Sequence, residues 1–228
     1  MTSPADQIPE ATIARLPGYL RVLSALDAEG VTRVSSTELA DAAGVQSALL
    51  RRDLSHFGSY GTRGVGYEVP VLVREIGEHV GSGTKWPVVV IGVGNLGRAL
   101  ARNDSMLGRD FRLAALVDSN PAVVGTTVAG IRVVSGGELE DSIHRTHARI
   151  AIVATPASAA QEVCNRVFEA GVTSILNFAP TTIVAPAGAT VRTVDLSQEL
   201  HILAFHEARR TAEQAGSATT QSAQEYQP

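Results

Sequence analysis

One stretch decides the fold, Val88-Val89-Val90-Ile91-Gly92-Val93-Gly94-Asn95-Leu96-Gly97, when it is read together with Asp118. An apolar run leads into a Gly-x-Gly-x-x-Gly sequence, and an acidic residue closes the next apolar run 21 residues after the last glycine. Strand–turn–helix units that bind a dinucleotide have this order and spacing. The stretch therefore predicts a Rossmann-like sheet with a nucleotide at the carboxyl end of its first strand.

Each position of the motif has an expected role. Gly92 permits the tight turn, Gly94 lets the backbone approach a pyrophosphate, and Gly97 lets the helix pack against the strand. Asp118 is placed to accept hydrogen bonds from a ribose diol, which favours NAD(H) over NADP(H) because a 2'-phosphate would meet a carboxylate. The residues between the glycines complete the predicted phosphate-binding loop, namely Val93, Asn95 and Leu96.

The rest of the second half alternates apolar runs with helical patterns. Strands are expected at 87–91, 112–117, 131–134, 149–154, 173–177 and 190–194, and helices at 95–103, 138–147 and 157–170. This alternation predicts an α/β fold with a doubly wound parallel sheet. Two loops at strand ends are expected to line the nucleotide cleft, namely Thr155-Pro156 and Asn177-Phe178-Ala179-Pro180.

The first 80 residues follow a different pattern. An amphipathic helix is expected over 12–28, and the segment 35–38 offers an N-cap and an acidic residue for a second helix over 37–43. Gly44 makes a turn before a third helix over about 46–57, and a glycine-rich hairpin follows at 58–69. Helix, short turn, helix and hairpin together predict a winged-helix domain that reads DNA.

The third helix and the hairpin carry the candidate DNA contacts. Over residues 44–66 three arginines stand against one aspartate, although the whole chain has a formal net charge of −4. Short polar residues and arginines on a recognition helix reach base edges and phosphates, and an arginine from the hairpin reaches an adjacent minor groove. The candidates are Gln46, Ser47, Arg51, Arg52, Arg63, Gly64 and Tyr67.

A hydride-transfer enzyme of this fold needs a proton donor or acceptor beside its substrate. The chain's single lysine, Lys85, precedes the first strand, and no histidine follows a predicted strand at its carboxyl end. No His, Cys or Glu cluster has metal-ligand spacing. The residues therefore favour a transcription factor without catalytic residues, whose DNA affinity depends on NAD(H) as a regulatory ligand. The alternatives are an NAD-dependent oxidoreductase with an accessory helical domain, a CoA-binding module, and a DNA-binding protein with a vestigial nucleotide site.

Composition and turn residues set the expected boundaries. They predict a winged-helix domain at 1–80, a Rossmann-like domain at 85–195, a C-terminal helix at 196–212 and a disordered tail at 213–228. The one cysteine, Cys164, excludes an intrachain disulfide, and no apolar run reaches the roughly 18 residues that would span a membrane. We therefore expect a cytoplasmic protein.

These motifs together resemble one family, the bacterial redox-sensing transcriptional repressor Rex, over about residues 8–207. The resemblance rests on the segments 8–12, 15–21, 35–40, 51–55, 57–67, 92–97, 175–180 and 194–196. It implies a homodimer that exchanges its last helix between subunits. It also implies binding to palindromic operator DNA when NADH is low and release from that DNA by NADH.

The resemblance further implies a switch, in which an ion pair joins Arg15 and Asp195 in the DNA-competent form. Many members have a tyrosine shortly after the glycine-rich helix begins, and this tyrosine bonds the aspartate in the NADH state. Asn103 stands at that position here, and its shorter side chain could not span the same distance. The sequence therefore predicts a switch that is weaker, rewired or sensitive mostly to occupancy of the site.

Overall fold

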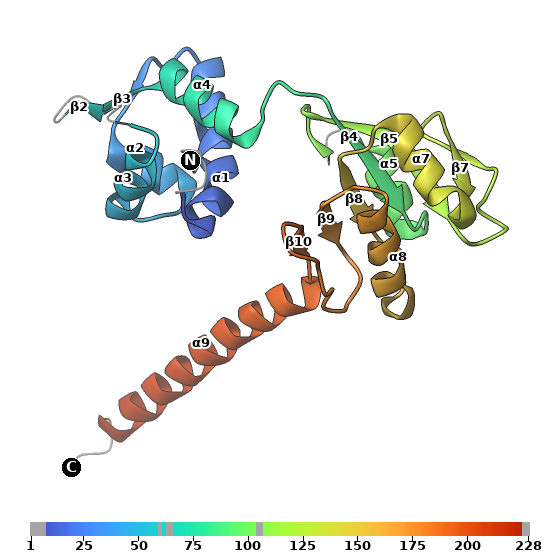
Figure 1. Ribbon diagram of the computed structural model, residues 1–228. Helices are drawn as coiled ribbons and strands as arrows, with labels where there is room; N and C mark the ends of the chain where they lie inside the picture. The colour runs from blue at the N-terminus through green and yellow to red at the C-terminus, as the bar shows by residue number, and fades with distance from the viewer. Residues whose placement is uncertain (1–7, 59–60, 63–65, 104–106, 225–228) are drawn as a thin grey trace. The chain divides into compact units, whose positions relative to one another are not determined.

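The computed structural model describes residues 8–58, 61–62, 66–103 and 107–224. The chain divides into two compact units, Met1–Lys85 and Trp86–Pro228, and each is described by itself (Figure 1). Arg63 and Gly64, two of the candidate DNA contacts, lie outside the described residues.

The first unit has the winged-helix architecture that the sequence predicts. Its described helices are α1 (Glu10–Ala28), α2 (Ser36–Ala43), α3 (Ser47–Ser55) and α4 (Val69–Val80). Its short strands β1 (Arg33–Val34), β2 (Gly61–Thr62) and β3 (Gly66–Glu68) pair antiparallel in the order β1-β3-β2. Helix α4 was not predicted as a separate element, although buried Val69, Leu72 and Ile76 recur at helical spacing.

Local chemistry explains where these elements begin and end. Ser35 caps α2 as expected, because its Oγ accepts from the Glu38 backbone N at 3.1 Å while the Glu38 carboxylate accepts from the Ser35 backbone N at 2.9 Å. Gly44 ends the helix in the left-handed region with a φ of 70°. Gly66, with a φ of 88°, brings β3 so close to β1 that a Cβ there would lie 2.5 Å from the Val34 carbonyl oxygen.

The second unit contains a seven-stranded sheet whose order is β10-β9-β8-β4-β5-β7-β6. Its strands are β4 (Trp86–Ile91), β5 (Phe111–Asp118), β6 (Thr127–Val128), β7 (Ile131–Ser135), β8 (Ile150–Val153), β9 (Ser174–Asn177) and β10 (Thr190–Thr193). All neighbours are parallel except β6 and β7. The chain winds outward from β4 in one direction and then returns to β8 on its other side, so the switch point of this doubly wound sheet lies between β4 and β8.

Helices cover both faces of this sheet, as its alternating side chains require. Helices α7 (Leu139–Thr146) and α8 (Ala157–Glu169) pack on the face that carries Val89, Val117 and Val153. Helix α5 (Asn95–Arg102) packs on the opposite face, against Val88 and Val90 (Figure 1). Successive residues of a strand point to opposite faces, so a strand buried on both sides reads as one continuous apolar run.

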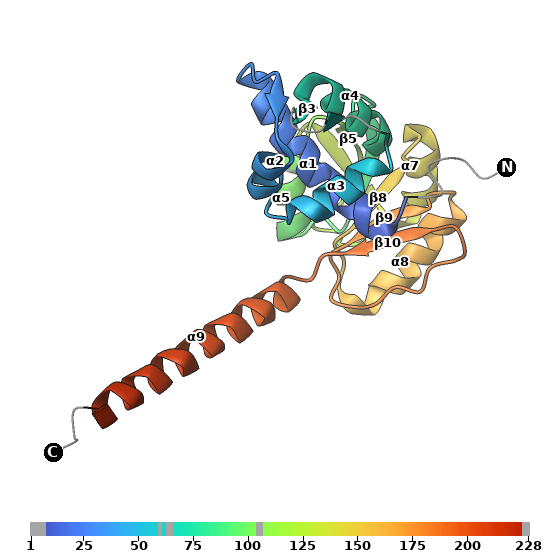
Figure 2. The same ribbon diagram turned by 90° about the vertical axis from the view of Figure 1, so that its left-hand side faces the viewer.

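The last helix, α9 (Leu196–Gln224), is one uninterrupted rod (Figure 2). The predicted end of this helix at residue 212 is wrong, since residues 213–224 contain no proline and one glycine does not stop an established helix. Residues 196–211 are all exposed within the chain. Its exposed large apolar side chains belong to none of the three hydrophobic cores of the described chain, and they are Leu196, Leu200, Ile202, Leu203 and Phe205.

Candidate nucleotide cavity and DNA-binding face

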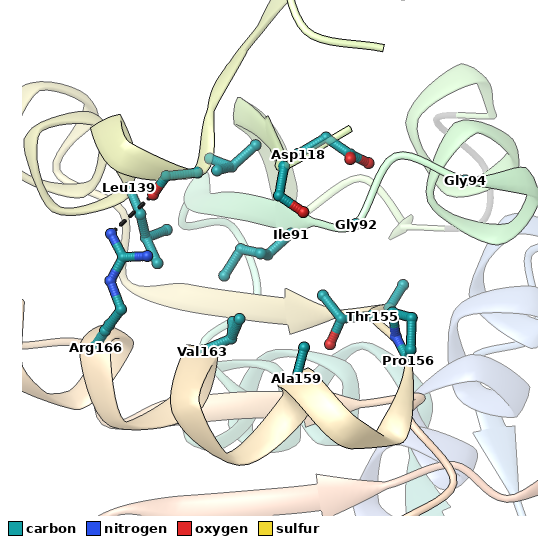
Figure 3. A pocket seen from close by; sticks show the side chains of 14 residues that line it. Ile91, Gly92, Gly94, Asp118, Leu139, Thr155, Pro156, Ala159, Val163 and Arg166 are labelled. Carbon is teal, nitrogen blue, oxygen red and sulfur yellow. Dashed lines mark hydrogen bonds between the residues drawn. The ribbon is translucent and has the colours of Figure 1, made fainter. Parts of the chain in front are cut away.

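A cavity of about 430 Å³ opens at the carboxyl ends of β4, β5 and β8, at the switch point of the sheet (Figure 3). Open parallel sheets bind their ligands at this place. Five of the predicted site residues line it, three of them at the ends of β4 and β5 and two in the loop after β8. The lining residues of this region are Ile91, Gly92, Gly94, Val117, Asp118 and Ser119.

Each of the three glycines in the motif is required for a different geometric reason. Gly92 has a φ of 93°, and a Cβ there would lie 2.5 Å from the Ala154 carbonyl oxygen. A Cβ at Gly97 would lie 2.0 Å from the Gly92 carbonyl oxygen, so α5 starts against the turn only with a glycine at this position. A Cβ at Gly94 would meet no atom within 4 Å, because this residue borders the open cavity. Gly94 is also the N-cap of α5, whose first N–H groups start at the cavity rim.

The Asp118 carboxylate is fixed by backbone donors on both of its oxygens. The Val93 backbone N donates to Oδ2 at 2.6 Å, and the Asn120 backbone N donates to Oδ1 at 2.7 Å. These bonds tie the end of β5 to the glycine turn and hold a negative charge on the cavity wall. The wall is therefore suited to hydroxyl donors and repels a phosphate.

Thr155 and Pro156 line the cavity from the loop after β8, as predicted. The Thr155 Oγ1 atom is buried and has no hydrogen-bond partner among the described residues. A buried hydroxyl without a partner is unfavourable, so its place on a cavity wall indicates that a ligand supplies the missing bond.

The opposite end of the cavity comes from α7 and α8, which the sequence reasoning did not connect with the site. Ala159, Val163 and Arg166 lie on one face of α8, at helical spacing, and line the cavity, with Arg166 at the Leu139 end, away from the glycine turn (Figure 3). Arg166 donates from Nε and Nη2 to the Glu140 carboxylate at 2.6 and 2.7 Å and from Nη2 to the Gly136 carbonyl oxygen at 2.8 Å. The hydrogen bonds with Glu140 raise the pKa of Arg166 and lower the pKa of Glu140, so the pair stays ionised.

The loop after β9 differs from expectation, because Asn177, Phe178, Ala179 and Pro180 are not among the residues that line this cavity. The Asn177 side chain is fully buried and turns back onto its own loop. It donates to the carbonyl oxygens of Ala179 at 3.1 Å and Thr181 at 3.0 Å, and it accepts from the Ala179 backbone N at 3.0 Å. Its amide thus shapes the loop, with both Nδ2 hydrogens donated to carbonyl oxygens of that loop.

Some residues of the glycine loop line the cavity, and the others do not reach it. Val93 and Gly97 are buried behind the cavity, and Asn95 and Leu96 are exposed on the first turn of α5. Of the loop's six residues, Gly92 and Gly94 reach the cavity surface.

The candidate DNA contacts on α3 lie at the surface of the first unit. Gln46 is the exposed N-cap of α3, Ser47 is half-buried in its first turn, and Arg51 and Arg52 are exposed. Tyr67 differs, because its ring is 8% exposed and belongs to the unit's core. A helix surface that exposes two adjacent arginines is electrostatically suited to phosphates.

Arg51 is held in place by its neighbours. Its Nη1 donates to the Ser36 Oγ of α2 at 3.1 Å. Burial raises the pKa of Tyr67, and the positive charge of Arg51 works against that rise. This hydrogen bond links the exposed arginine of α3 to the first residue of α2.

The three predicted switch residues have partners of their own in the structure. Arg15 forms a bidentate ion pair with Asp53 of α3, with Nε–Oδ2 and Nη2–Oδ1 distances of 2.7 Å. Asp195 caps α9, since its Oδ1 accepts from the Ser197 Oγ at 2.6 Å and from the Ser197 backbone N at 2.9 Å. These bonds lower the pKa of Asp195. Asn103 is the exposed C-cap of α5.

Comparison with known proteins supports both units. Residues 7–55 match the family described as "Putative DNA-binding protein N-terminus", and residues 84–181 match the one described as "CoA binding domain". The redox-sensing transcriptional repressor Rex of Streptomyces avermitilis is 58% identical over 208 residues, which cover 91% of this chain and 82% of that protein. This chain belongs to the Rex family. The Rex protein of Roseiflexus sp. is 43% identical over 204 residues, 90% of this chain and 93% of that protein.

Solved Rex-family structures have the same architecture. The crystal structure of RSP in complex with beta-NAD+ and operator DNA has a TM-score of 0.83 at 32% identity, covering 92% of this chain and 97% of that one. The crystal structure of RSP in complex with beta-NADH has a TM-score of 0.82 at 31% identity and covers 92% and 98% of the two chains. The resemblance that the sequence motifs indicate is therefore confirmed at the level of Rex-family membership and fold.

Across the described residues, every helix is too short or too polar to cross a lipid bilayer. In the same part of the chain, His, Cys, Asp and Glu side chains form no group of three or more that could hold a metal ion.

Proposed function

We propose that this Rex-family chain represses transcription by binding operator DNA when NADH is low and is released from the DNA by NADH. One observation carries the proposal: a winged helix with exposed arginines and a sheet whose switch-point cavity is built on Gly-x-Gly-x-x-Gly belong to one chain. The Rex relatives and the RSP complexes with beta-NAD+, beta-NADH and operator DNA support it.

The cavity fits a dinucleotide by its own chemistry. Gly94 and the first turn of α5 are suited to the pyrophosphate, and the Asp118 carboxylate is suited to a ribose diol. The unpartnered Thr155 hydroxyl offers a further bond. Bound NAD(H) supplies a nicotinamide whose charge differs by one unit between its oxidised and reduced forms, and the protein reads that difference without consuming the ligand.

DNA contact is assigned to the exposed surface of α3 and to the hairpin that follows it. Gln46 and Ser47 are offered to base edges, and Arg51 and Arg52 are offered to bases and phosphates. The hairpin residues Arg63 and Gly64 belong to the same proposal. Tyr67 supports this surface from the core beneath it.

The functional unit in this proposal is a homodimer. Over residues 196–211 helix α9 is exposed, and we assign the burial of its apolar side chains, such as Leu200, Leu203 and Phe205, to a second copy of the chain. A palindromic operator needs two recognition helices about one helical turn apart, roughly 34–36 Å. NADH can release such a dimer only if it binds better to a shape in which this spacing is changed.

The switch within this dimer is assigned to Arg15, Asn103 and Asp195. The side-chain hydrogen bonds by which Asp195 caps α9 in the described structure fall on Oδ1, and this proposal assigns Oδ2 to the ion pair with Arg15. Asn103 carries an amide where many members carry a tyrosine. In this proposal the NADH response is therefore smaller than that of a tyrosine-containing relative.

CoA is the second candidate ligand, because the family that matches residues 84–181 is described as a CoA binding domain. CoA carries a 3'-phosphate on the ribose that Asp118 would contact, and the carboxylate disfavours it. Competition between CoA and NADH for the purified protein separates the two ligands. Displacement of NADH by CoA at comparable concentration would overturn the assignment.

The deciding experiment measures operator affinity directly. A labelled palindromic operator, selected from a random pool, is titrated by fluorescence anisotropy with protein alone, with NAD+ and with NADH at one salt concentration. Release by NADH and not by NAD+ supports the proposed function. Tight binding that ignores both nucleotides contradicts the proposed switch, and failure to select any DNA contradicts the repressor and favours an enzyme.

A further inference from the structure

The first unit contains a buried charge cluster that the proposed DNA contacts do not use. Asp53 lies on α3, next to Arg52, and is 1% exposed. Its carboxylate accepts four hydrogen bonds, all from α1. The donors are Thr12 Oγ1 at 2.9 Å, Arg15 Nε and Nη2 at 2.7 Å each, and Tyr19 Oη at 2.8 Å.

The geometry of this cluster fixes one helix against the other. Thr12, Arg15 and Tyr19 follow one another at helical spacing, so they form one face of α1 that meets a single side chain of α3. Each Asp53 oxygen accepts two bonds, which satisfies a carboxylate that water does not reach. Rotation or sliding of α3 along α1 would break several of these bonds at once and leave a buried charge unpaired. Because an unpaired buried charge is costly, the cluster fixes the position of α3 relative to α1.

The protonation states agree with that geometry. Burial opposes the charged form of Asp53, but the hydrogen bonds from Arg15, Tyr19 and Thr12 outweigh it, so the pKa of Asp53 is lowered. Burial, reinforced by the bond to Asp53, raises the pKa of Tyr19 to about 12, so the phenol remains a donor at neutral pH. The cluster is therefore an ionised carboxylate with permanent donors.

Asp53 cannot serve as a DNA contact. It is buried and negatively charged, whereas DNA presents phosphates. Its neighbours Arg51 and Arg52 are exposed on the same short helix, so any movement of Asp53 moves both arginines with it. The carboxylate thus acts on DNA only through the position of α3.

Arg15 is the member of this cluster whose side chain reaches the protein surface. Its side chain is 28% exposed, and its bonds to Asp53 use the Nε hydrogen and one Nη2 hydrogen. A guanidinium has five N–H groups, so three remain for other acceptors. In the described part of the chain, Asp53 is the acidic group that pairs with Arg15.

We propose that Asp53 is a positioning residue that couples Arg15 on α1 to the recognition helix α3. An acidic group that binds the outer N–H groups of Arg15 then acts on Arg51 and Arg52 through the Asp53 carboxylate. The inference rests on the proposed function, since it assigns the path by which a signal at Arg15 changes operator affinity.

The test uses the full-length protein and three variants. Asp53→Asn keeps the shape of the side chain and removes its charge and one acceptor oxygen. Tyr19→Phe removes one hydrogen bond and no charge. Asp27→Asn is the matched control, because Asp27 is an exposed acid on the same helix α1. Operator affinity with and without NADH, the affinity for NADH itself and the melting temperature are measured for each.

The coupling predicts a specific pattern. Asp53→Asn weakens operator binding by at least about tenfold and brings the ratio of operator affinities with and without NADH toward one, while NADH binds the second unit as tightly as in the wild type. Tyr19→Phe shifts the same ratio in the same direction by a smaller factor. Asp27→Asn matches the wild type in every measurement.

Other outcomes overturn the coupling. A purely structural role would lower the melting temperature and the fraction of DNA-competent protein but leave the NADH-dependent ratio of the folded fraction unchanged. If Asp53→Asn does not fold, a wild-type ratio in Tyr19→Phe overturns the proposal. A wild-type protein that ignores NADH refutes the proposed function instead, and unchanged operator affinity in the Asp53→Asn variant would then overturn the positioning role separately.

Discussion

The substitution Thr155→Val has opposite expected effects on the free protein and on its complex with NADH. The Thr155 hydroxyl is buried without a partner in the described structure, and such a hydroxyl costs about 1–3 kcal/mol in proteins. Valine has nearly the same shape and removes the polar atom, so the unliganded protein becomes more stable. Because about 1 kcal/mol shifts the melting temperature of a domain of this size by about 2–4 °C, we expect a rise of at least that much.

The same substitution weakens ligand binding. A hydrogen bond between the hydroxyl and the dinucleotide contributes about 0.5–1.5 kcal/mol, so its loss raises the Kd for NADH by about 2- to 12-fold. Differential scanning calorimetry measures the first effect on the unliganded protein, and titration of NADH measures the second.

Two controls accompany the variant. Thr155→Ser keeps the hydroxyl and retains most of the affinity for NADH. Thr146→Val removes a hydroxyl that already donates to the Ser142 carbonyl oxygen at 2.6 Å, so it lowers the melting temperature and leaves the Kd unchanged. A Thr155→Val protein that melts at a lower temperature and binds NADH normally would refute the argument that a ligand completes this hydroxyl.

Four further predictions concern the remaining sites. Asp118→Ala removes the acceptor for the ribose diol and frees the Val93 backbone N, so NADH binds at least about tenfold more weakly by titration calorimetry; an unchanged Kd would remove Asp118 from the site. Arg52→Ala leaves NADH affinity intact, weakens operator binding and reduces the slope of log affinity against log salt by about one, and an unaltered slope would contradict the phosphate contact. The pKa of Asp53 is lower in the folded protein than its ordinary value of 3.8, so the ionised carboxylate stabilises the first unit fully above pH 3.8. This stabilisation is lost as the pH falls through the folded-state pKa, and the free energy of unfolding of Asp53→Asn should therefore depend less on pH in the acid range. Identical acid-unfolding curves would contradict the role of this charge. Burial raises the pKa of the Cys164 thiol to about 11, so a thiol reagent modifies it at neutral pH only after unfolding, and rapid labelling of the native protein would show the burial to be wrong.

Local sequence signals predicted most of the fold because they act over a few neighbouring residues. The run Val88–Ile91 is apolar on both faces and must lie inside a sheet, and Ser35 with Glu38 marks a helix start whatever surrounds it. These signals found all six of the longer strands and the helices α1, α2, α3, α5, α7 and α8 within a few residues of their ends. The two-residue strands β1 and β6 escaped, because they gain their pairing from a partner strand and carry no pattern of their own.

The errors came from segments whose state depends on context. The end of α9 was placed too early because a polar stretch of Ala, Gln, Ser and Thr reads as tail when no packing is considered. The role of Asn177 in ligand binding stays a prediction; the structure adds that its amide has three hydrogen bonds within its own loop. The end of a predicted strand locates the backbone of a residue. The direction of its side chain depends on the hydrogen-bond partners around it, which the sequence pattern does not give.

The sequence by itself determined the motif, its order and hence the family: a glycine turn needs particular residues at fixed local spacing, and Gly92, Gly97 and Gly66 are required by backbone contacts under 3 Å. Only the tertiary structure decided which distant residues complete each site. Arg166 lines the same cavity as the glycine turn from a helix about 70 residues further along the chain, and Asp53 meets α1 across 34 to 41 residues. Such meetings depend on how helices pack, and packing is a property of the whole core that no local spacing encodes.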